Sequence, residues 1–175
     1  GAISETDLRA AAEDIWTSRQ VFTLGVGVNN ANARNFTYLA STGMSQFHGI
    51  PKAGSTAIDD LAWANDQDVL IAITCKPYRS EVVEAVRVAR EQGVKIVGIS
   101  DSPASPIIVG SDHGFAVVAE TPQFFPSSLT TVALLETLLS FVIASASSEI
   151  PQDILTVEIL EQDLFVYLTI FLMII

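Results

Sequence analysis

The chain has 175 residues, of which 49% are hydrophobic and 17% are charged, so its composition indicates one globular domain and excludes an intrinsically disordered chain. The chain has 9 Lys and Arg residues and 20 Asp and Glu residues, so its net charge is −11. Binding to duplex DNA needs cations that neutralise phosphates, so we expect this acidic chain not to bind it. The single cysteine, Cys75, excludes an internal disulfide, and together with a polar start that shows no signal peptide it predicts a cytoplasmic protein.

The spacing of apolar residues predicts alternating helices and strands from the start of the chain. Ser4 is expected to cap a helix whose apolar residues share one face: Leu8, Ala11, Ala12, Ile15 and Trp16. The elements predicted next are a strand at 21–24, a helix at 31–42, a weak strand at 44–47, and a helix that runs from a cap at Ser55 or Thr56 through Ala64.

The second half of the chain continues the alternation. The predicted elements are a strand at 68–74, an amphipathic helix at 80–92, a strand at 94–100, a strand at 115–119 and a long apolar helix at 127–146. Strands that are apolar on both faces and separated by helices are typical of a parallel sheet that is covered on both sides. The sequence therefore predicts an α/β three-layer sandwich over residues 1–148, with a five-stranded parallel sheet in the order 2-1-3-4-5.

A sheet of this order places its ligand crevice at the carboxyl ends of strands one and three, where the order reverses. Two turns meet there, "GVGVNN" at 25–30 and "TCKPYRSE" at 74–81. In the first turn, Gly25 and Gly27 let backbone amides approach a ligand, and Asn29 or Asn30 is expected to cap the helix that follows.

The second turn adds a hydroxyl from Thr74, two cations from Lys76 and Arg79, and Ser80 at the head of a helix. We predict that a small anionic ligand contacts both turns. The predicted contact residues are Gly25, Gly27, Val28, Asn29, Asn30, Thr74, Cys75, Lys76, Arg79 and Ser80. The alternative is that the cations are solvated loop charges and that the glycines only shape the turn.

Other phosphate and metal motifs fit the sequence less well. A dinucleotide-binding fingerprint would need glycine where Asn30 stands, and the P-loop pattern is absent. His48 and His113 are the only histidines and Cys75 is the only cysteine, so neither a metal nor a cofactor is predicted.

Three segments together resemble the SIS (sugar isomerase) domain, most closely the version that forms the effector-binding half of RpiR-type transcriptional regulators. They are "FTLGVGVNNANA", "DVLIAITCKPYRSEVVEAVRVAREQGVKIVGISDSPASPI" and "SSLTTVALLETLLSFV", and the resemblance covers residues 5–147. The resemblance implies that the chain binds a phosphosugar, forms a homodimer and contacts DNA only through a separate domain.

The two turns depart from the family pattern, in which hydroxyl residues hold the phosphate. Val28 and Asn29 stand where the first turn usually has serine. In the second turn, Lys76 replaces a serine, Pro77 a glycine and Arg79 a threonine. Cations bind anions through charge-assisted hydrogen bonds, so the ligand is expected to be a phosphosugar held differently or a sugar acid, unless the site is silent.

Two further functions stay open. An aldose–ketose phosphosugar isomerase would need a base near the crevice, for which Glu81 and Glu120 are the candidates. A non-catalytic dimerisation module would use the apolar helix at 127–146, whose apolar surface exceeds what one sheet face needs. The apolar segment at 164–175 is shorter than the roughly 20 residues of a membrane span, so no membrane contact is predicted and the tail at 149–175 is left without a role.

Overall fold

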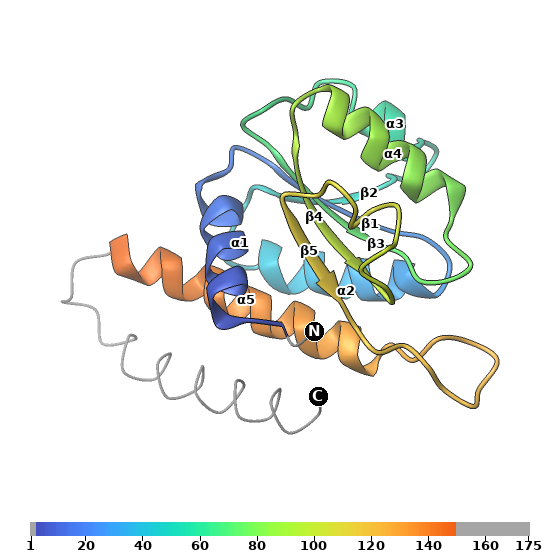
Figure 1. Cartoon of the computed structure of the whole chain (residues 1–175). Helices are drawn as coiled ribbons and strands as arrows, with labels where there is room; N and C mark the ends of the chain where they lie inside the picture. Colours follow the sequence, from blue (N-terminus) through green and yellow to red (C-terminus); the bar gives the residue numbers. More distant parts are fainter. Residues whose placement is uncertain (1–2, 150–175) are drawn as a thin grey trace.

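Five parallel strands form the central sheet in the order β2-β1-β3-β4-β5, as the sequence predicted. The computed structural model describes residues 3–149 and is drawn in Figure 1. The strands are β1 (Val21–Gly25), β2 (Phe47–Ile50), β3 (Val69–Ile73), β4 (Lys95–Ser100) and β5 (His113–Ala116). Every residue of β3 is buried, which explains why its sequence reads as one continuous apolar run.

Helices cover both faces of this sheet, so the predicted three-layer sandwich is confirmed. The helices are α1 (Glu5–Thr17), α2 (Val28–Ser41), α3 (Ala57–Asp60), α4 (Ser80–Glu91) and α5 (Leu129–Glu149). In Figure 1, α3 and α4 lie on one side of the sheet and α1, α2 and α5 on the other. Two separate groups of buried apolar residues, one on each side, fill the space between the layers.

The apolar length of α5 is explained largely by packing inside the protein. Leu134, Leu138 and Phe141 are buried in the core that α5 shares with α1 and the sheet. By length and composition alone, residues Leu129–Ala146 could cross a membrane, but 44% of this window is buried inside the protein. Several of the apolar side chains that the sequence suggested for a dimer interface are therefore internal, whereas Leu129 at the start of α5 is exposed.

Several predicted boundaries are wrong, and the reasons are local. Helix α2 begins at Val28 instead of residue 31, because the backbone reverses at Gly27 and enters the helix at once. Strand β2 lies at 47–50 instead of 44–47, where its first residue pairs with the first residue of β1. Strand β5 covers 113–116 instead of 115–119, because its pairing with β4 ends at Ala116.

Two smaller predictions in this region also need correction. The helix that Thr56 caps ends at Asp60 instead of Ala64, although Leu61 and Ala64 remain buried in the turn that follows. The apolar spacing of the helix predicted at 31–42 places Leu39 on the inward face with Ala33, Phe36 and Ala40, but Leu39 is exposed on α2. The tail predicted at 149–175 lies beyond the described residues apart from its first residue, so the domain boundary at 148 stays a prediction.

Charged side chains hold together the edge of the sheet where the strands begin. The buried carboxylate of Asp68, just before β3, accepts from Arg19 Nε at 3.0 Å, from Arg19 Nη2 at 2.6 Å and from the Asn65 amide at 2.9 Å. Arg19 precedes β1, so this pair ties the starts of the two central strands to each other.

A second charged contact joins α1 to the starts of β4 and β5 at the same edge. The carboxylate of Asp14 lies 2.5 Å from Lys95 Nζ and 2.7 Å from His113 Nε2. Partial burial opposes ionisation of Asp14, but its hydrogen bonds to Lys95 and His113 outweigh this effect and lower its pKa.

We predict that Asp68→Ala lowers the free energy of unfolding by about 2–3 kcal/mol, because it leaves Arg19 and the Asn65 amide without their buried acceptor. Urea unfolding followed by circular dichroism measures the change. Glu5→Gln is the control, since it breaks the exposed Arg9–Glu5 pair of α1 and should cost less than about 1 kcal/mol. Equal losses in the two variants would contradict a special role for the buried carboxylate.

Candidate functional site

The turn after β1 depends on two glycines. A Cβ placed on Gly25 would lie 2.3 Å from the carbonyl oxygen of Asn29, so no other residue fits without moving the backbone. Gly27 has φ of 62° and is the N-cap residue of α2, and no side chain caps this helix. The first amide groups of a helix have no acceptor within it, and they carry partial positive charge. The turn therefore presents an uncapped helix N-terminus at the predicted crevice.

The two asparagines after Gly27 lie in the first turn of α2, so the prediction that one of them caps the helix is wrong. Asn30 Nδ2 donates to the Gly25 carbonyl at 3.1 Å, and its Oδ1 accepts from Arg34 Nε at 3.1 Å. Asn29 is buried, and its Oδ1 accepts from Asn32 Nδ2 at 3.3 Å. Both side chains therefore hold the turn against the body of α2.

In the second turn, Thr74 and Cys75 are buried and the cations are exposed. Thr74 Oγ1 accepts from the Arg79 amide at 3.2 Å, and the Thr74 carbonyl accepts from Ser100 Oγ at 2.6 Å. Burial, and then the negative charge of Asp101, raise the pKa of Cys75 to about 11. The hydroxyl and the thiol predicted as ligand contacts are therefore parts of the folded turn.

The side chain of Arg79 crosses from the second turn to the first. A Cβ placed on Gly27 would lie only 3.0 Å from Arg79 Nη2, so the guanidinium lies directly against the N-cap residue of α2. Among the described residues, no carboxylate forms an ion pair with Arg79. A guanidinium beside an uncapped helix N-terminus is an arrangement that favours an anion.

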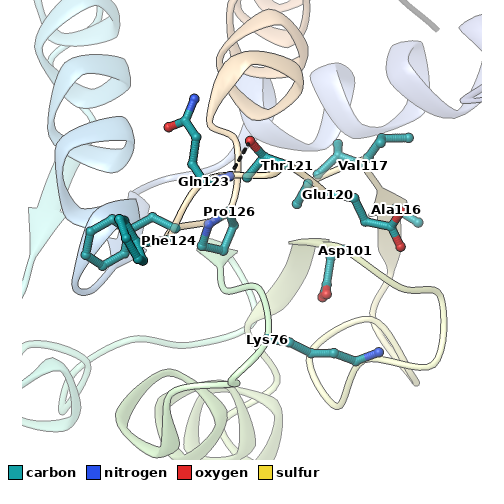
Figure 2. A pocket seen from close by; sticks show the side chains of 12 residues that line it. Lys76, Asp101, Ala116, Val117, Glu120, Thr121, Gln123, Phe124 and Pro126 are labelled. Carbon is teal, nitrogen blue, oxygen red and sulfur yellow. Dashed lines mark hydrogen bonds between the residues drawn. The ribbon is translucent and has the colours of Figure 1, made fainter.

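Lys76 lies in a different cavity, which we call the loop cavity, with a volume of about 650 Å³. Its other walls are Asp101 after β4 and the segment from Ala116 to Pro126 that leads from β5 toward α5 (Figure 2). Glu120 belongs to this segment, so the cavity holds one cation and two carboxylates. Arg79 is not part of this lining, so Lys76 and Arg79, both predicted to contact the anion, do not line this cavity together.

Ser80 and Glu81 line a third region, the α3–α4 groove of about 690 Å³, together with Pro51, Ile58 and Glu84. The two candidate bases, Glu81 and Glu120, are thereby placed in separate cavities. Within the described part of the chain, no group of three or more His, Cys, Asp and Glu side chains could hold a metal ion.

Sequence reasoning missed Asp101 and the segment from Thr121 to Pro126. Asp101 directly follows β4, and the carboxyl ends of parallel strands face the ligand crevice, so its position was a usable signal. The segment from Thr121 to Pro126 has no helix or strand of its own. No spacing pattern could therefore place it beside Lys76.

Comparisons with known proteins agree with the fold described above. The sequence pattern of the SIS domain matches residues 14–143. The chain is 26% identical over 151 residues to an uncharacterised HTH-type transcriptional regulator of Clostridium perfringens. The match covers 83% of this chain and 53% of that protein, so the chain spans about half the length of this curated relative.

Two solved structures share the fold. The sugar isomerase domain of an RpiR transcription factor from Sphaerobacter thermophilus has a TM-score of 0.75 and 25% identity, over 83% of this chain and 81% of that one. The Vibrio vulnificus NanR protein complexed with ManNAc-6P has a TM-score of 0.72 and 14% identity, over 99% of this chain and 62% of that one.

The buried thiol gives a pH-dependent test of this geometry. At pH 8, alkylation of Cys75 by iodoacetamide should be about a hundredfold slower than that of an ordinary cysteine with a pKa near 8.5. Because the pKa of Cys75 is about 11, the rate should still rise between pH 9 and pH 10, where an ordinary thiol levels off. Mass spectrometry follows the reaction, and the urea-unfolded chain is the control. Rapid labelling of the folded chain at pH 8 would show that the thiol is accessible.

Proposed function

The chain belongs to the SIS domain family, and on this premise we propose that it is the effector-sensing domain of an RpiR-type transcriptional regulator. Its ligand would be a small anionic sugar derivative, either a phosphosugar or a sugar acid. DNA contact would fall to a separate domain of a longer protein that acts in the cytoplasm. The similarity to a longer HTH-type regulator, of which the match covers 53%, and to NanR complexed with ManNAc-6P, supports this proposal.

The observation that carries the proposal is the position of Arg79 against Gly27. An anion placed there would receive charge-assisted hydrogen bonds from the guanidinium and would face the positive end of α2. The family's usual hydroxyl side chains are replaced by a cation here, but the preference of the site for an anion is kept. Asn30 stabilises the turn by donating a hydrogen bond to the Gly25 carbonyl.

A phosphosugar isomerase is the second candidate, and the loop cavity favours it. Lys76, Asp101 and Glu120 line this one cavity, so a base and a cation are available to one ligand. Proton transfer between adjacent carbons needs such a base within hydrogen-bond reach of the substrate. We prefer binding over catalysis because Arg79, the cation that carries the binding proposal, does not line the cavity that contains the candidate base Glu120.

We also propose that the chain forms a homodimer. Four large apolar side chains are exposed in and around the segment that links β5 to α5: Val118, Phe124, Phe125 and Leu129. Phe124 is fully exposed. An apolar group of this kind on a soluble domain is typical of an interaction surface, and a second copy is the partner that the family predicts. This segment, more than the buried face of α5, would form the interface.

The ligand proposal is tested by a thermal-shift screen of hexose phosphates, pentose phosphates and sugar acids. A ligand at 100 times its dissociation constant should stabilise the fold by about 2.7 kcal/mol. Arg79→Gln should weaken binding about tenfold or more, because it removes a charge-assisted contact. Arg87→Gln is the control in α4, the helix that follows Arg79, since Arg87 pairs with Glu84 and Glu91 on the exposed side.

Each outcome of the screen separates the candidate functions. Binding that Arg79→Gln weakens and Arg87→Gln does not would support the sensing role. If no compound stabilises the wild-type chain, the proposal fails. If a compound binds and is converted to its isomer, the enzymatic function applies, and Glu120→Gln should abolish the conversion.

The dimer proposal is tested by sedimentation at micromolar concentration. The wild-type chain should sediment as a dimer, and the double variant Phe124→Ser with Phe125→Ser should sediment as a monomer with unchanged circular dichroism. The contrasting variant Trp63→Ser removes another exposed aromatic outside this segment and should leave the dimer intact. A monomeric wild-type chain would end the proposal.

A further inference from the structure

A pocket of about 400 Å³ lies between α2 and the end of β2, and the proposed function makes no use of it. We call it the α2–β2 pocket. Arg34, Thr37 and Tyr38 of α2 line one part of it, Lys52 after β2 lines another, and Thr23 of β1 belongs to the lining as well. Its volume is within the range of about 300–1,000 Å³ that is usual for small-molecule sites.

The charge of this pocket is opposite to that of the chain. Arg34 and Lys52 contribute two cations, and no carboxylate belongs to the lining. The loop cavity, by contrast, holds two carboxylates for one cation, and the α3–α4 groove is lined by two glutamates. Because the whole chain has a net charge of −11, a pocket lined by two cations and no carboxylate differs in sign from the rest of the protein.

Both cations are available to a ligand. Within the described residues neither forms an ion pair, whereas Arg9, Arg19, Arg87 and Lys95 all do. Arg34 uses only its Nε, which donates to Asn30. The nearby carboxylate of Asp60 is occupied by the Lys52 backbone amide at 2.7 Å and by Ser55 Oγ at 2.9 Å.

The pocket also contains a buried hydroxyl without a partner. Thr23 is fully buried, and its Oγ1 has no hydrogen bond in the described part of the chain. An unpaired buried hydroxyl costs stability, and such groups are rare in folded proteins. Thr37 Oγ1 donates to the Ala33 carbonyl at 2.8 Å and keeps its lone pairs for a donor.

We propose that the α2–β2 pocket is a second ligand site, which takes a hydroxylated organic anion of monosaccharide size. The charged group would lie between Arg34 and Lys52, and a ligand hydroxyl would pair with Thr23. A phosphate ester and a carboxylate both carry the negative charge that the two cations would bind, so the ligand can be a sugar phosphate or a sugar acid. This site is separate from the Arg79 site, since neither Arg79 nor Gly27 lines it; Asn30, which fixes the Gly25 carbonyl, forms part of its wall.

Nuclear magnetic resonance titration of the ¹⁵N-labelled chain tests the proposal with glucose 6-phosphate, gluconate, inorganic phosphate and neutral glucose. The reporting amides are those of residues 37–38, 49–50 and 52–53, because these residues line the α2–β2 pocket and neither of the other two cavities. Glucose 6-phosphate or gluconate should shift them, and glucose should not. The amides of residues 26–28, 76 and 78–80 report the Arg79 site, so failure at one site is distinguished from failure at the other.

Two pairs of substitutions with the same change in net charge complete the test. Arg34→Gln with Lys52→Gln should weaken binding in the pocket at least tenfold, through loss of two charge-assisted contacts. Lys76→Gln with Arg79→Gln should leave this binding within about twofold, since neither side chain lines the pocket.

Thr23→Val separates a binding role from a structural one. It should raise the melting temperature of the free chain by roughly 2 °C, because it removes an unpaired buried hydroxyl, and yet weaken binding about fivefold. A chain that loses stability with this substitution would contradict the role of the hydroxyl.

Three results would overturn the proposal as a whole. The first is that neither organic anion shifts the amides of residues 37–38, 49–50 and 52–53 at millimolar concentration. The second is that the Lys76 and Arg79 substitutions abolish these shifts. The third is that inorganic phosphate binds as tightly as glucose 6-phosphate, since the pocket would then not recognise the hydroxylated body.

Discussion

The close approach of the backbone at Gly25 and Gly27 is the constraint on which the rest of the site depends. Gly25 must lack a Cβ because the Asn29 carbonyl lies against it, and Gly27 must adopt φ of 62° for α2 to begin at the next residue. Because this N-cap residue is glycine, it has no side chain to cap the helix, so the N-terminus of α2 stays open. Arg79 can then lie directly on Gly27 and present its guanidinium to the same space.

The distribution of charge explains how so acidic a chain could recognise an anion at the proposed sites. Most acidic residues contribute to a surface that repels anions at a distance, so recognition requires cations that carboxylates do not neutralise. Arg34, Lys52 and Arg79 are such cations among the described residues, and each lies beside an opening in the fold or beside a helix end. The remaining negative surface also agrees with a domain that leaves DNA contact to another part of the protein.

The regular parts of the fold could be predicted from the sequence because their signals are local. The apolar runs that became β3 and β4, and the period of α4, are dictated by burial within the segments themselves. The start of α2 could not be predicted, because it depends on the positive φ of Gly27. The α2–β2 pocket was missed because Arg34 and Lys52 come from different elements, which the parallel pairing of β1 with β2 brings together.

The charged contacts of Asp68 and Asp14 lie at the edge where the strands begin, which is opposite to the edge that carries the turns. Among the described residues, the two turns hold no ion pair of this kind. Apart from Gly25 and Gly27, side chains in the turns can therefore change without breaking the charged contacts at the opposite edge, and a lineage could exchange serine and glycine for lysine, proline and arginine there while the sheet stayed intact. A change of effector would then require only a few mutations in two short turns, and the same scaffold could be recruited to sense different metabolites in related regulators.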